Sequence, residues 1–196
     1  MSSAAVILVE GDSDAAAVLA LAGRLGRDLD AERVSVVSLG GASAYGDALS
    51  DLLVRQRFTG GVTGLYDEAE AGDVRRGLER AGCGSGLSRE DMENLGFHMC
   101  VADLEDEMVR ALGSEAVERV IAAEDELRAF RTMQRQPAWR ARPVEDQLRR
   151  FLGVKSGRKI RYGRLLVDAL DLDRVPRPLR RVLDHVSERS PPGRID

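Results

Sequence analysis

The chain has 196 residues and a formal net charge of −4, with two cysteines and one tryptophan. This length suits one domain of ordinary size, and the two cysteines, which have no metal-ligand spacing around them, exclude a disulfide framework. The first residues lack a basic segment, and the apolar run at 6–9 is too short to span a bilayer, so we expect a cytoplasmic protein without membrane contact.

The charges are sorted along the chain. Residues 1–130 contain 12 Arg, no Lys and 25 Asp or Glu, a balance of −13, whereas residues 131–196 contain 17 Lys or Arg and 8 Asp or Glu, a balance of +9. We therefore predict an acidic body, residues 1–130, followed by a basic extension, residues 131–196. This sorting suits a protein that gathers cations in one place and phosphates in another, although ion pairs between the halves would give the same count.

The first hundred residues alternate short β-rich runs with amphipathic stretches. Four strands are predicted, at residues 5–9, 33–39, 61–66 and 96–101. Ser13 or Asp14 is expected to cap a helix that runs to about Gly26, and a second helix is expected at about 43–56. Strands that alternate with helices predict an α/β fold with a parallel four-stranded sheet and flanking helices.

After residue 103 the β signal disappears, and the rest of the chain is predicted to be helical. The expected helices lie at about residues 103–112, 114–130, 144–151, 158–170 and 176–188. The charge changeover near Arg131 marks the boundary between the α/β domain and a helical C-terminal extension.

Acidic side chains follow three of the four predicted strands. They are Glu10, Asp12 and Asp14 after the first strand, Asp67, Glu68 and Glu70 after the third, and Asp103, Glu105, Asp106 and Glu107 after the fourth. Taken singly, each cluster suits the N-terminus of the helix that it opens. Three clusters at the carboxyl edge of one sheet would repel one another, however, unless cations compensated them. The repetition therefore favours a site for one or two Mg²⁺ or Mn²⁺ ions that serve phosphodiester chemistry.

The order of these motifs resembles a known family. Glu10-Gly11 after the first strand, Gly40-Gly41 after the second and the acidic run from Asp67 after the third resemble a TOPRIM domain, the metal-binding module of topoisomerases, primases and several nucleases. The resemblance covers most of the chain and implies a Rossmann-like sheet.

A closer resemblance is to the TOPRIM nuclease domain of the overcoming-lysogenization-defect (OLD) family. It rests on Glu10-x-x-x-Asp14, on Asp103-x-Glu105 and on Lys159 late in the chain. The resemblance implies that Glu10 and Asp14 ligate one metal ion. It also implies a second ion, held by Asp67 and Glu105 with help from Asp103, and a Lys159 side chain that stabilises charge on the scissile phosphate.

One position departs from the family pattern. The third-strand motif is usually Asp-x-Asp, but Ala69 occupies the second acidic position here, which leaves Glu68 or Glu70 to reach the ion. The predicted metal ligands are Glu10, Asp14, Asp67, Glu70, Asp103 and Glu105. The predicted catalytic residues are Glu10 and Lys159, and no organic cofactor is expected.

The leading interpretation is an Mg²⁺- or Mn²⁺-dependent endonuclease that hydrolyses DNA. Relatives commonly join this domain to an ABC-type ATPase, but these residues contain no Gly-x-x-x-x-Gly-Lys-[Ser/Thr] loop, so the expected protein partners are a separate ATPase or a second copy of the chain. The alternatives are a non-catalytic metal- or DNA-binding regulatory module, which Ala69 favours, and a nucleotidyl transferase.

Four further features bear on nucleic acid or on packing. The basic run at 158–164 suits a phosphate backbone, unless its arginines pair with the acidic body. Trp139 is interpreted as a packing anchor, with stacking on a base as the alternative. His98 is expected to be buried in the fourth strand, and His185 to lie at the surface.

Overall fold

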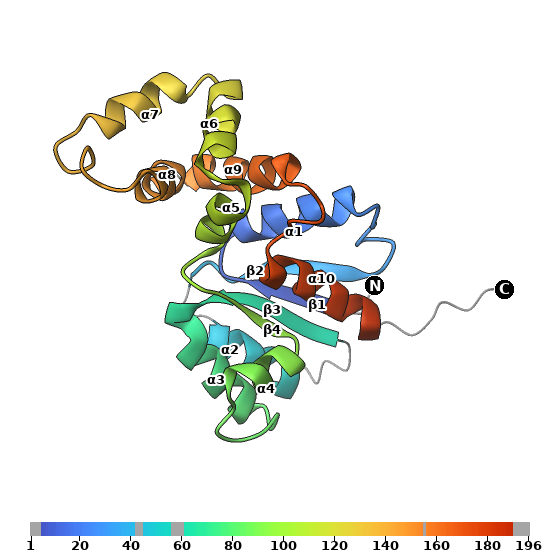
Figure 1. The fold of residues 1–196 in the computed structure, drawn as a ribbon. Coiled ribbons are helices and arrows are strands. Elements are labelled where there is room, and N and C mark those ends of the chain that lie inside the picture. Colours follow the sequence, from blue (N-terminus) through green and yellow to red (C-terminus); the bar gives the residue numbers. More distant parts are fainter. Residues whose placement is uncertain (1–4, 42–44, 56–60, 155, 190–196) are drawn as a thin grey trace.

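A parallel four-stranded sheet forms the centre of the computed structural model, which describes residues 5–41, 45–55, 61–154 and 156–189 (Figure 1). The strands are β1 (Ala5–Val9), β2 (Val34–Ser38), β3 (Gly61–Asp67) and β4 (Phe97–Cys100). Their order is β2-β1-β3-β4, and every pairing is parallel. The predicted strands and the predicted α/β fold are therefore confirmed.

Helices cover both faces of the sheet. On one face lie α2 (Tyr45–Ser50), which continues as a π-helix over Asp51–Arg55, α3 (Ala71–Arg80) and α4 (Arg89–Asn94). On the other face lie α1 (Asp12–Arg24) and α10 (Arg177–Arg189). Two separate cores result, and β1 contributes to both: Ile7 packs on the α1 side and Leu8 on the α2 side, as expected when successive side chains of a strand alternate.

The remaining helices form a group that stands beyond α1 in Figure 1. They are α5 (Leu104–Leu112), α6 (Ser114–Ala123), α7 (Leu127–Gln134), α8 (Val144–Gly153) and α9 (Ser156–Ala169). The predicted helix at 114–130 is wrong, because the chain turns at Asp125, whose φ of 57° is left-handed. The turn lets Phe130 fold back against Phe151, with the ring centroids 5.3 Å apart.

Helix α9 packs closely along α1. A Cβ atom at Gly163 would lie 2.5 Å from the backbone oxygen of Ser13, so only glycine permits this approach. Lys159, one turn before Gly163 on α9, is thereby placed beside the N-terminus of α1. Core residues from 1–130 and from 131–186 belong to one cluster, and the predicted boundary near Arg131 remains a prediction.

Two local expectations are wrong. Helix α1 begins at Asp12, with Gly11 as its N-cap, so neither Ser13 nor Asp14 is the N-cap, although the Asp14 side chain at N3 accepts the Gly11 N–H. His185 is buried, since α10 returns to the sheet and stacks its ring edge-on against His98, with the centroids 6.0 Å apart. His98 is buried as expected.

Over the residues that the structure describes, no helix is both long enough and apolar enough to cross a bilayer.

Candidate metal centre

Three strands of the sheet end side by side at one edge. Because β1, β3 and β4 are adjacent and parallel, the residues that follow them lie close together. Glu10 follows β1, Asp67 ends β3, and Asp103 lies three residues beyond β4. The predicted convergence of acidic side chains at this edge is what the fold produces.

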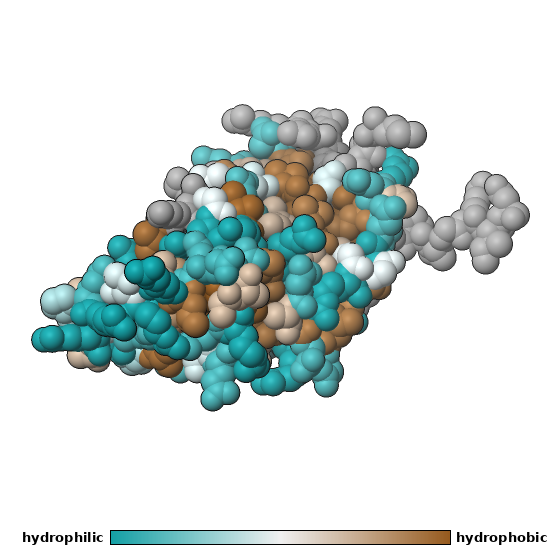
Figure 2. Space-filling view, turned by 90° about the horizontal axis from the view of Figure 1, so that it is seen from above, coloured by the Kyte–Doolittle hydropathy of each residue, from teal (hydrophilic) through white to brown (hydrophobic). Residues whose placement is uncertain are grey.

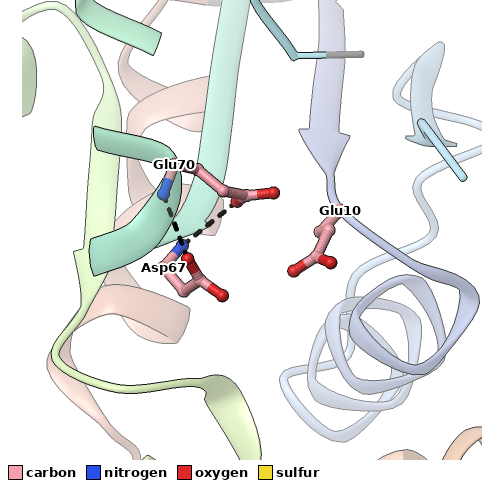
Figure 3. A group of neighbouring side chains, drawn as sticks. All are labelled: Glu10, Asp67 and Glu70. Carbon is pink, nitrogen blue, oxygen red and sulfur yellow. Dashed lines mark hydrogen bonds between the residues drawn. The ribbon is translucent and has the colours of Figure 1, made fainter. Parts of the chain in front are cut away.

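The tightest acidic group consists of Glu10, Asp67 and Glu70 (Figure 3). One carboxylate oxygen from each residue lies within 4.8 Å of the other two. Asp67 and Glu70 come from the two ends of a single 3₁₀ turn, Glu68–Glu70, which the Asp67 side chain caps. The Asp67 carboxylate accepts from the Glu70 N–H, and the Glu70 carboxylate accepts from the Asp67 N–H, each at 3.2 Å. This reciprocal pair fixes both carboxylates, and Figure 3 shows them facing Glu10.

Glu70 is the most unusual member of the group. It is fully buried, and its Oε1 atom has no hydrogen-bond partner among the described residues. A buried carboxylate oxygen without a donor is costly, and a hard cation would satisfy it. The three oxygens therefore fit a divalent ion, and Glu70, rather than the exposed Glu68, is the side chain beside Ala69 that turns inward.

The electrostatics of the group point the same way. Burial, followed by the charge of Glu10, raises the pKa of Glu70 to about 7. Burial, followed by the charges of Asp67 and Asp14, raises the pKa of Glu10. Each carboxylate thus opposes ionisation of the next, and a bound cation would remove that opposition.

A second set of carboxylates adjoins the first. A hollow of about 20 Å³, large enough for one water-sized species, is lined by acidic side chains, by Lys159 and by the uncharged residues Leu65, Tyr66, Cys100 and Leu104. The acidic residues that line it are Glu10, Asp14, Asp67, Asp103 and Glu105. Every predicted metal ligand except Glu70 therefore lines the hollow. Glu70 lies beside two of the lining residues, Glu10 and Asp67.

Lys159 compensates part of this second set. Its Nζ atom lies 3.5 Å from Oε1 of Glu105. Partial burial acts to lower the pKa of Lys159, but the carboxylates of Glu105, Asp14 and Glu10 outweigh it and raise that pKa. Glu105, which is buried, has a pKa raised to about 7 by that burial, against the opposing charge of Lys159. The ammonium group therefore stays protonated at neutral pH.

Asp14 and Asp103 are both hydrogen-bonded within the chain. Asp14 is buried and accepts the Gly11 N–H at 3.0 Å, and its burial raises its pKa. Asp103 caps α5 by accepting the Asp106 N–H at 2.7 Å, and it also accepts from Arg149 at 3.0 Å. Arg149 therefore compensates Asp103, whereas none of the ion pairs found among described residues involves Glu10, Asp67 or Glu70.

Three residues that shape this edge carry no sequence motif that predicts their role. Arg149 on α8 is one, and Gly163 on α9 is another. The third is the buried Tyr45, whose hydroxyl group is within hydrogen-bonding distance of the carbonyl oxygens of Leu8 and Leu65, at 2.9 and 3.2 Å. It thus ties β1 to β3 just before both strands reach the site, and no local pattern marked it.

All three arginines of the basic run at 158–164 are engaged with acidic residues. Arg158 and Arg161 each lie 2.9 Å from Glu126, and Arg164 lies 3.4 Å from Asp168. For these side chains, the alternative of pairing within the protein is the arrangement that the structure has.

The comparisons with known proteins agree with this fold. A family model described as the TOPRIM domain of overcoming-lysogenization-defect-like proteins matches residues 2–52. The C-terminal region of the OLD protein of Xanthomonas campestris pv. campestris superposes with a TM-score of 0.73 and 26% identity, over 95% of this chain and 93% of that chain. The corresponding region of the Burkholderia pseudomallei OLD protein gives a TM-score of 0.69 at 22% identity, over 96% and 98%. A search of the curated proteins found no match.

Proposed function

We propose that this chain, which has the TOPRIM fold of the OLD type, is a divalent-metal-dependent nuclease that hydrolyses phosphodiester bonds in DNA. The observation that carries the proposal is the Glu10, Asp67 and Glu70 group, with the buried, unpartnered oxygen of Glu70 at its centre. Oxygen-only ligands of this kind suit Mg²⁺ or Mn²⁺. A cytoplasmic location and a separate ATPase partner belong to the same proposal.

Different residues of the chain would hold the metal ion and stabilise the charge on the phosphate. Glu10, Asp67 and Glu70 would hold the ion and orient it at the edge of the sheet. A bound Mg²⁺ or Mn²⁺ would supply Lewis-acid stabilisation of a phosphate oxygen and a lowered pKa for a bound water. Lys159, protonated and directed into the adjoining hollow, would place a second positive charge near the same phosphate.

The charge balance favours one resident ion. Asp103 is compensated by Arg149 and Glu105 by Lys159, whereas no described side chain forms an ion pair with the group around Glu70, and Lys159 acts on Glu10 without pairing with it. In this arrangement Lys159 supplies the positive charge that a second ion supplies in two-metal sites.

A non-catalytic metal- or DNA-binding module is the second candidate. It is favoured by the single three-carboxylate group found in the described part of the chain. A nicking assay separates the two candidates, because only the nuclease changes the topology of its DNA.

The test uses the purified chain, supercoiled plasmid and Mg²⁺ or Mn²⁺. We expect nicking that chelation with EDTA stops, and at least a ~100-fold loss of rate in Glu10→Ala and Glu70→Ala, since each removes a metal ligand. Glu68→Ala is the matched control, because Glu68 is exposed in the same turn and should be without effect. Circular dichroism confirms that each variant is folded.

Nicking that survives Glu10→Ala would overturn the proposal. Metal-dependent DNA binding without any cleavage would favour the non-catalytic module instead.

A further inference from the structure

A second hollow adjoins the metal centre on the side of the helical group. It lies under the loop at 135–143, between α7 and α8, and has a volume of about 390 Å³. Its lining residues are Asp103, Trp139, Arg142, Asp146, Arg149 and Arg150. We call it the Trp139 groove. Asp103 lines both this groove and the hollow of the metal centre, so the two are neighbours with Asp103 between them.

The loop at 135–143, which forms part of the groove, is held in place by hydrogen bonds to a side chain of α8. The buried side chain of Gln147 donates to the carbonyl oxygens of Trp139 and Arg142 at 2.8 and 2.9 Å, and it accepts from Gln134 at 2.6 Å. Within the loop, the Arg142 N–H donates to the Trp139 carbonyl at 2.9 Å. Trp139 and Arg142 are thus positioned before any ligand arrives, and Gln147 is a positioning residue.

The arginines of the groove differ from those of the basic run. Arg142 and Arg150 are exposed, and neither forms an ion pair with a residue that the structure describes. The Arg150 guanidinium lies instead over the Trp139 ring, 5.7 Å from its centroid. The loop at 135–143 itself has no acidic residue, and Figure 2 shows that the end of the molecule formed by α7 and this loop is mostly hydrophilic.

Two unpaired guanidinium groups beside a half-buried indole have the chemistry of a nucleic-acid subsite. Arginine pairs with phosphate through a planar fork, and an aromatic ring provides a surface for a base or a sugar. The location matters as well, because the carboxylates of the metal centre repel a polyanion and a substrate needs cations nearby. The groove offers those cations at the border of the metal centre, on the far side of Asp103.

We infer that the Trp139 groove binds the stretch of DNA strand that leads away from the scissile phosphate. Arg142 and Arg150 contact its phosphates, and Trp139 packs against a base or sugar. This inference rests on the proposed function, since it assigns part of the substrate to the groove.

The test exploits the fact that Trp139 is the only tryptophan of the chain. A fluorescein-labelled single-stranded oligonucleotide and a duplex are each titrated with protein in EDTA, so that no cleavage occurs, and binding is followed by anisotropy. Unlabelled DNA is titrated in parallel, with tryptophan emission as the signal. We expect emission to change with the same midpoint as anisotropy.

The diagnostic variant is Arg142→Ala/Arg150→Ala. We expect its Kd to rise about tenfold or more and the slope of log K against log salt to fall by about 1 to 2, because two phosphate contacts are removed. The matched control is Arg75→Ala/Arg119→Ala, which removes two exposed arginines of α3 and α6 that also lack ion pairs with described residues. Its Kd and slope should stay within about twofold of the wild type.

The outcomes separate this inference from the proposed function. DNA binding with unchanged tryptophan emission, or with equal loss in both double variants, would overturn the groove even if the chain nicks plasmid. If DNA binding depends on Arg142 and Arg150 but the chain does not nick plasmid, the result would support DNA binding by the Trp139 groove and overturn the proposed nuclease activity. Absence of any DNA binding would overturn both.

Discussion

Among the described residues, the carboxylates of Glu10, Asp67 and Glu70 at the acidic edge of the sheet have no ion-pair partner. The acidic cluster of the helical group, Glu124 and Glu126, is instead paired with Arg158 and Arg161. Glu126 is bonded to Arg158, Arg161 and Tyr162, and the hydrogen bond from Arg158 is the main cause that lowers its pKa. Glu70 has no such cation, and burial raises its pKa to about 7. A cluster of carboxylates therefore marks a candidate site only where the chain leaves it uncompensated, because a compensated cluster is already satisfied by its own fold.

The largest effect on stability should come from the compensated cluster. Glu126→Ala removes one acceptor from two arginines and a tyrosine, and it leaves the mostly buried Arg158 unpaired. We expect the free energy of unfolding to fall by about 2 to 4 kcal/mol, measured by urea denaturation. Glu124→Ala is the control, because the ion pair of Glu124 found among the described residues is with the half-exposed Arg161, and its loss should cost under about 1 kcal/mol. Equal losses in the free energy of unfolding for the two variants would show that the pairing of Glu126 does not stabilise the fold more than the pairing of Glu124.

The contact between α1 and α9 should give the next largest effect. Gly163→Ala puts a methyl group 2.5 Å from the Ser13 backbone, so α9 must move away from α1 and carry Lys159 with it. We expect a loss of about 1 to 3 kcal/mol in stability together with slower nicking. Gly157→Ala, on the same helix with open space at its Cβ, is the control. Nicking at the wild-type rate in Gly163→Ala would show that the position of Lys159 is unimportant.

The smallest effect has the opposite sign. In metal-free buffer at pH 8, Glu70→Gln should raise the free energy of unfolding by about 1 kcal/mol, because it removes a buried charge among other carboxylates. Glu70 has a folded pKa of about 7 against an ordinary 4.5, so the folded state is the better proton binder. Its penalty on stability is therefore absent below pH 4.5 and grows as the pH rises towards and past 7.

Thermal unfolding of wild type and Glu70→Gln between pH 4.5 and pH 8.5 checks this prediction. The two curves should converge at low pH and separate at high pH. Curves that stay parallel would show that Glu70 ionises as freely in the folded chain as in water.

The sequence predicted the parts of this protein that local patterns encode. The four β-rich runs and the acidic residues after three of them suffice to predict the sheet and its acidic edge. Because Ala69 occupies the expected acidic position, either Glu68 or Glu70 could have been the metal ligand. The 3₁₀ turn decides between them, since it buries Glu70 and exposes Glu68. That turn is a capping box in which Asp67 and Glu70 bond each other's N–H groups, and the Asp67-x-x-Glu70 spacing is the sequence signal that favours Glu70.

Features that depend on distant packing escaped prediction. His185 lies in a helix of charged residues, yet α10 returns to β4, where the absence of a side chain at Gly96 makes room for its ring. Gln147 sits in an ordinary amphipathic helix, and its role in holding the loop at 135–143 depends on a contact across α7 and α8. The break at Asp125 likewise follows from the packing of Phe130 on Phe151.

The carboxylates of Glu10, Asp67 and Glu70, which have no ion-pair partner among the described residues, are proposed to bind a divalent ion. Calorimetric titration of the metal-free chain with Mn²⁺, alongside Glu70→Gln and the exposed-residue control Glu68→Gln, tests this role. We expect one ion bound per chain in wild type and in Glu68→Gln, and affinity at least about tenfold weaker in Glu70→Gln. Equal Mn²⁺ affinity in all three proteins would show that these carboxylates do not hold the ion.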